Sequence, residues 1–158
     1  MASVRALLRQ VLHLQESPHR TALAFAIGSA IAFCPFYGFH MALVGLCTWA
    51  FNLNFIALLA GALINNPWTI VPIFGATYWT GALLLGRSDT PAFDWRELGF
   101  GAVYEQVMPY AVPFAVGGVV LSVAAAFVSY PVALYIITKH RQTAARHAEP
   151  LPPPKPLR

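Results

Sequence analysis

The chain has 158 residues, of which 58% are hydrophobic and 10% are charged, and its formal net charge is +4. Soluble globular domains average about 45–50% apolar and 25% charged residues, so this composition leaves too few polar residues to cover a soluble domain of this size. The positive charge gathers at the two ends of the sequence, which is typical of a membrane protein and does not indicate a nucleic-acid partner.

Residues 1–16 predict an amphipathic helix, in which apolar residues recur at near-helical spacing with Arg5, Arg9 and Glu16 between them. The segment is too short and too charged to span a bilayer, and no small-residue cleavage site follows it. We therefore expect it to lie on the cytoplasmic membrane surface. A targeting presequence is the alternative.

Residues 21–86 contain no Asp, Glu, Lys or Arg. One bilayer crossing takes roughly 20 apolar residues, so this segment could cross about three times. Two polar interruptions divide it, FCPFYGFH at 33–40 and LINNPWT at 63–69. We predict an integral membrane protein whose function depends on these interruptions.

Residues 17–51 predict a helical hairpin. Ser17 is a good N-cap and Pro18 suits the first helical position, whereas Pro35 and Gly38 would end the helix and turn the chain. Small residues on two roughly opposite stripes would let neighbouring helices approach closely: Ala22, Ala26 and Ala30, and Ala24, Gly28 and Ala32. The hairpin either dips into the bilayer and returns or spans it fully.

Residues 55–86 predict one crossing that is interrupted at Asn65–Pro67. Asn66 can cap the following helix, Pro67 would occupy its first turn, and the Thr69 hydroxyl would meet the exposed N–H groups. A helix that starts within the bilayer points the positive end of its dipole inward, as in transporters that bind anionic substrates. The alternative is a kink in which the Asn side chains only satisfy the backbone.

Residues 87–115 predict an outer loop and interfacial segment, because Pro109 and Pro113 disfavour a regular span. A C-terminal span is expected over 116–138, followed by a disordered Pro-rich tail over 141–158. The two ends of the chain are richer in Lys and Arg than the acidic 87–106 loop, so both termini are expected in the cytoplasm.

His40 is the only His within residues 21–86, which makes it a functional candidate. Alternatively, its neutral imidazole hydrogen-bonds a carbonyl freed by the break at Pro35. Cys34 and Cys47 have no metal-binding spacing, and the chain lacks a membrane acid pair, a nucleophile elbow or a phosphate-binding Gly loop. We therefore predict no enzyme activity, no catalytic residue, no metal and no cofactor.

The stretches SPHRTALAFAIGSAIAFCPFYGFH and ALINNPWTIVPIFGATYWTGALLLG resemble a family of small bacterial inner-membrane proteins, catalogued as a domain of unknown function, number two thousand and sixty-two. The matching features are Ser17-Pro18, Gly28, Pro35, Gly38, His40, Asn54, Asn66-Pro67, Thr69, Tyr78 and Gly81. Some members of the family are joined to glycosyltransferase-like domains, so the resemblance implies a place in cell-envelope or lipid-linked sugar metabolism. It implies no particular activity.

Together these patterns predict an all-α, polytopic, multi-pass protein of the inner membrane, with broken or re-entrant helices and an N-terminal surface helix. The leading hypothesis is a transporter or lipid-translocating protein for an anionic or phosphate-bearing substrate, built as a homo-oligomer among membrane lipids. Pro35, Gly38 and Pro67 would form the breaks, and the substrate-binding residues would be His40, Asn65, Asn66 and Thr69, with Arg20 near the entrance. The alternative is a non-catalytic scaffold that anchors a glycosyltransferase-type envelope enzyme.

Overall fold

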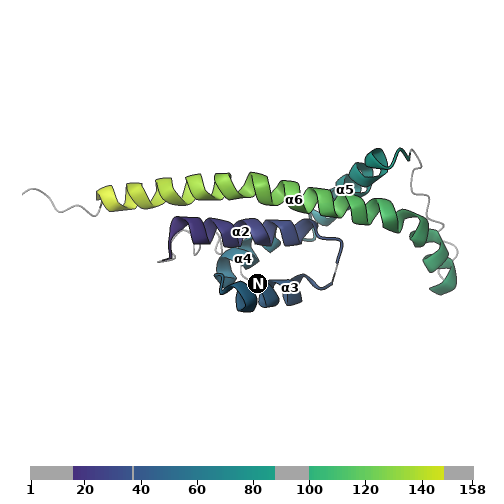
Figure 1. The fold of residues 1–158 in the computed structure, drawn as a ribbon, viewed down its shortest axis with the longest axis horizontal. Coiled ribbons are helices and arrows are strands. Elements are labelled where there is room, and N and C mark those ends of the chain that lie inside the picture. The colour runs from purple at the N-terminus through teal and green to yellow at the C-terminus, as the bar shows by residue number, and fades with distance from the viewer. Residues whose placement is uncertain (1–15, 37, 88–99, 148–158) are drawn as a thin grey trace, which may run out of the picture.

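The structure, a computed structural model, describes residues 16–36, 38–87 and 100–147 (Figure 1). These residues form helices and no strands, which confirms the predicted all-α class. The helices are α2 (Pro18–Phe33), α3 (His40–Phe51), α4 (Phe55–Ala62), α5 (Ile70–Leu84) and α6 (Phe100–His147). The surface helix predicted over 1–16 lies almost entirely outside the described residues.

Helix α6 is the helix against which both α2 and α5 pack. It has 48 residues and contains Pro109, Pro113 and Pro131. The sequence predicts a loop and interfacial segment up to residue 115, yet α6 begins at Phe100, and it continues to His147 through the first residues of the predicted tail. Figure 1 shows α6 bending near its N-terminal end. Proline removes one backbone hydrogen bond and crowds the preceding turn, so Pro109 and Pro113 bend the helix near its start instead of ending it.

Helices α2 and α5 pack one after the other along α6 (Figure 1). At the start of α2, His19 Nδ1 and the Tyr130 hydroxyl of α6 lie 3.0 Å apart in a hydrogen bond. Beyond the end of α5, Arg87 Nη1 donates to the carbonyl of Pro109 at 3.1 Å. Both helices therefore run antiparallel to α6, with α5 on its N-terminal part and α2 on its C-terminal part.

Glycines allow the helix backbones to touch at two of these contacts. A Cβ atom added to Gly28 of α2 would lie 2.1 Å from the carbonyl oxygen of Leu58 in α4, and one added to Gly81 of α5 would lie 1.7 Å from that of Pro113 in α6. Either distance is far below van der Waals contact. Helix α2 packs against both α4 and α6, in agreement with the central position that its small-residue stripes predict.

Helices α2 and α3 run in opposite directions. Helix α2 ends at Phe33, and the turn that follows contains Gly38 in the left-handed region at φ 91°. Helix α3 then returns until Asn52, whose carbonyl accepts a hydrogen bond from Arg20 Nη2 at 2.5 Å. Helix α4 runs parallel to α2, which brings Asn65 to the end of α2.

Large apolar side chains cover much of the outer surface. Trp49 is 83% exposed and Trp68 is 91% exposed. Among the described residues, one helix is long and apolar enough to cross a membrane, over Tyr104–Thr143, and only 17% of its most apolar window is buried. A core helix of a soluble protein would be mostly buried, so this exposure favours a lipid environment.

Candidate functional site

The two interruptions of the apolar sequence line one groove. It has a volume of about 540 Å³ and lies between the turn after α2 and the start of α5. Its lining comes from two segments: Gly38, His40 and Met41 from the first break, and Ala62, Leu63, Asn65, Asn66, Pro67, Ile70 and Phe74 from the second. The structure therefore brings together Gly38, His40, Asn65, Asn66 and Pro67, whereas Pro35 and Thr69 are not among the lining residues.

The first break ends α2 because Pro35 has no N–H group to donate to the carbonyl of Ile31. The carbonyl of Ile31 accepts a hydrogen bond from the backbone N–H of Cys34 at 3.1 Å, and the imidazole of His40 also hydrogen-bonds to the backbone of Ile31. Asn65 Nδ2 donates to the next carbonyl, that of Ala32, at 3.1 Å. His40 and Asn65 thus cap the carbonyl end of α2 from two different segments.

The second break is a turn closed by its own side chains. Asn66 Oδ1 accepts hydrogen bonds from the backbone N–H groups of Trp68 at 2.9 Å and Thr69 at 3.2 Å. Thr69 Oγ1 donates to the carbonyl of Ile64 at 2.6 Å and accepts from the backbone N–H of Asn66 at 2.9 Å. Helix α5 begins at Ile70, so Asn66 acts in the turn that leads into the helix.

The electrostatics of the groove come mostly from helix ends. Four helix ends lie beside it: the negative ends of α2 and α4 and the positive ends of α3 and α5. Among the described residues that line the groove there is no Lys, Arg, Asp or Glu, and His40 is the only one with an ionisable side chain. A mostly apolar lining with a few fixed polar groups suits an apolar or amphipathic ligand better than a small free anion.

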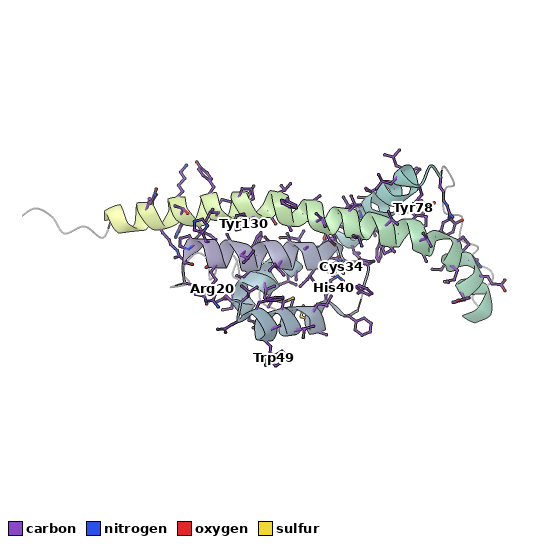
Figure 2. All side chains as sticks on the ribbon, viewed as in Figure 1. Arg20, Cys34, His40, Trp49, Tyr78 and Tyr130 are labelled. Carbon is purple, nitrogen blue, oxygen red and sulfur yellow. The ribbon has the colours of Figure 1, made fainter. Side chains whose placement is uncertain are left out.

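Arg20, which is predicted to stand near the entrance of the site, does not line this groove. It is at the start of α2, roughly 20 Å from the break at a rise of about 1.5 Å per residue. Figure 2 shows Arg20 and His40 at opposite ends of the α2–α3 hairpin. The guanidinium binds the carbonyl of Asn52, which follows α3 at φ 50°, and so stabilises the negative end of that helix.

Five groove residues were not among the predicted site residues: Met41, Ala62, Leu63, Ile70 and Phe74. Each is apolar and lies in an apolar sequence, so its type carries no signal. Their position would have been the only clue, because each lies within about two helical turns of a break. Cys34 and Cys47 are free thiols and do not line the groove.

These features define a class: a helical protein built on one long apolar helix, with a groove between two helix interruptions. The model of a family described as uncharacterised proteins conserved in bacteria, DUF2062, matches residues 1–146. The chain belongs to this family. No curated protein and no solved structure matches it.

Proposed function

We propose that the protein is a polytopic protein of the bacterial cytoplasmic membrane that binds a phosphate-bearing lipid in the groove between the breaks and moves it between leaflets. One observation carries this proposal: two polar helix breaks line one groove of about 540 Å³ within an otherwise uncharged apolar region. Non-helical backbone at membrane depth is tolerated where it is buried in protein or lines a cavity. Groove-lining breaks meet that condition.

The proposed topology follows from helix lengths. Helix α2 has 16 residues and α3 has 12, so they are about 24 and 18 Å long, shorter than the roughly 30 Å hydrocarbon core. They form a re-entrant hairpin. Helices α4 and α5 then make one interrupted crossing, and α6 returns to the cytoplasmic side. The groove lies in the outer half of the bilayer.

A lipid suits this groove better than a small anion. The lining offers apolar surface for acyl chains, and His40, Asn65 and the start of α5 supply the polar contacts for a head group. The groove is open to the surrounding lipid, and a chain of this size would complete a pathway as a homodimer or larger assembly.

A bulky side chain at a lining position that makes no hydrogen bond in the groove tests the proposal. Met41 lines the groove and is 54% exposed, whereas Leu46 lies on the same helix, is 55% exposed and does not line it. In liposomes containing a fluorescent phospholipid, wild type and Leu46→Trp should exchange the lipid between leaflets, and Met41→Trp should slow this exchange about tenfold or more, equivalent to about 1.4 kcal/mol in the barrier. Equal rates for the two variants, or no exchange by wild type, would contradict the proposal.

A second candidate is a non-catalytic scaffold for a glycosyltransferase-type envelope enzyme. It is favoured by the observation that His40, Asn65, Asn66 and Thr69 all hydrogen-bond to backbone groups. On this account His40→Ala and Asn66→Ala lower stability but spare function in cells. Changes to residues 1–16 or to the tail would instead abolish binding of the partner enzyme, measured by co-purification.

A further inference from the structure

The bend of α6 falls where the helix lacks two of its own hydrogen bonds. Pro109 and Pro113 carry no N–H group, so the carbonyls of Glu105 and Pro109, four residues earlier in each case, do not receive the usual α-helical hydrogen bond. Figure 1 shows the bend in this part of α6. A helix that loses hydrogen bonds in two successive turns has little of its own to fix the angle between its two parts.

A side chain from outside α6 takes up one of these two carbonyls. Arg87 follows α5, and its Nη1 donates to the carbonyl of Pro109 at 3.1 Å. Hydrogen bonds from a charged donor are roughly twice as strong as neutral ones. The guanidinium therefore takes the place of the N–H group that Pro113 lacks.

The end of α5 sets the position of Arg87. Gly86 adopts the left-handed region at φ 64°, and its N–H donates to the carbonyl of Leu83 at 3.3 Å, while the N–H of Arg87 donates to that of Ala82 at 2.9 Å. This pair of bonds is the Schellman motif of helix ends. A Cβ atom added to Gly86 would meet nothing within 4 Å, so glycine is needed here for its backbone conformation and not for space.

Helix α5 is also in contact with α6 beyond the bend. A Cβ atom added to Gly81 would lie 1.7 Å from the carbonyl oxygen of Pro113, and one added to Gly117 would lie 1.8 Å from that of Thr77. The ring centroids of Phe74 and Phe114 are 5.2 Å apart. The body of α5 thus packs on residues 113–117, whereas Arg87 reaches back to residue 109. Helix α5 and its cap therefore bridge the two sides of the bend.

We propose that Arg87 is a positioning residue that fixes the angle of α6, and that Phe100–Met108 swings about Pro109–Pro113 when the hydrogen bond from Arg87 opens. Arg87 is exposed, so this bond lies where it can open without unpacking the helices. The proposal uses neither the membrane location nor the lipid movement proposed above. Either can fail without the other.

Distances between two spin labels measure the angle. In detergent micelles, with Cys34 and Cys47 replaced by Ala, nitroxide labels are placed at Tyr104→Cys and Val119→Cys, which are 57% and 56% exposed and lie on the two sides of the bend. Double electron–electron resonance should give one narrow distance distribution for this protein. Arg87→Gln should broaden the distribution about twofold, because a helix that lacks two hydrogen bonds then holds the segment alone.

Two matched controls separate this role from a loss of charge or of fold. Arg20→Gln also removes a guanidinium that binds a backbone carbonyl, that of Asn52, and should leave the distribution narrow. Gly86→Val should broaden it as Arg87→Gln does, since a β-branched residue resists a positive φ. Gly86→Asn should not, because Asn tolerates the left-handed region. This last pair tests the proposal even if Arg87→Gln fails to fold.

Rescue by a second substitution is the sharpest test. Pro113→Ala restores the N–H group that the carbonyl of Pro109 lacks within the helix, so Arg87→Gln should leave the distribution narrow in that background. A general loss of stability would not be rescued in this way. A narrow distribution in Arg87→Gln alone, or the same broadening with and without Pro113→Ala, would overturn the proposal.

Discussion

His40, Asn65 and Thr69 each place a polar side-chain atom against a backbone group beside a helix interruption. In lipid no water is present to take such a role, and an unsatisfied backbone group costs several kcal/mol. These three side chains therefore satisfy backbone groups at the two breaks. Any role in ligand binding is added to this structural role.

Thr69 allows this structural role to be measured. Its hydroxyl makes two hydrogen bonds, to the carbonyl of Ile64 and from the N–H of Asn66. Thr69→Val keeps the shape but loses both, so it should lower the free energy of unfolding by about 2 kcal/mol, whereas Thr69→Ser keeps both and should cost less than about 1 kcal/mol. Denaturant unfolding in detergent micelles measures the difference. Equal stability of the two variants would show that the hydroxyl does not hold the turn.

At the scale of elements, backbone contact between helices fixes the arrangement. Gly28 lets α2 touch α4, and Gly81 lets α5 touch α6. Close approach of backbones replaces the hydrophobic effect as the main source of helix association in lipid, because acyl chains are as apolar as the side chains. The groove between the breaks depends on these contacts, since they place α2 and α4 side by side.

Gly28→Ala should therefore separate α2 from α4. The added methyl group would lie 2.1 Å from the Leu58 carbonyl oxygen, and overpacking of this kind costs about 1–3 kcal/mol. Gly45→Ala in α3 is the control, because nothing lies within 4 Å of its added Cβ. It should be neutral or stabilising by about 0.5–1 kcal/mol, since Ala is the better helix former. Thermal unfolding in micelles compares them, and a stable Gly28→Ala would contradict the contact.

The positions of helix ends were predictable where local chemistry decides them. Ser17 and Pro18 start α2, and Pro35 stops it close to the predicted residue. Pro109 and Pro113 misled the prediction, because a helix can pass through proline when neighbouring segments satisfy the freed groups. The position of Arg20 relative to the groove was also unpredictable, since it depends on the direction in which α3 folds back.

The whole molecule has apolar side chains outside and small residues between its helices. Helix α6 has 48 residues and is therefore about 72 Å long, more than twice the roughly 30 Å hydrocarbon core. In the proposed topology, part of it lies outside the bilayer or along its surface. In the proposed topology, the stretch of α6 that packs on α2 crosses the membrane.

That topology predicts the sidedness of the chain. Thr143 is exposed near the end of α6, and a cysteine there should react with a membrane-impermeant maleimide only from the cytoplasmic side. A cysteine in place of Ser88, in the loop predicted to be outside, should react only from the opposite side. Inverted and right-side-out vesicles distinguish the two. Reaction of both from one side would refute a return crossing by α6.

The depth of the groove between the breaks is the central claim, and a spin label at Met41 measures it most directly. In liposomes, with Cys34 and Cys47 replaced by Ala, a label on Met41→Cys should collide often with oxygen, which concentrates in the hydrocarbon, and rarely with a water-soluble nickel complex. A label on Thr143→Cys should show the reverse. If the label at residue 41 collides with nickel as readily as the label at residue 143, the groove lies in water and the account of its function is wrong.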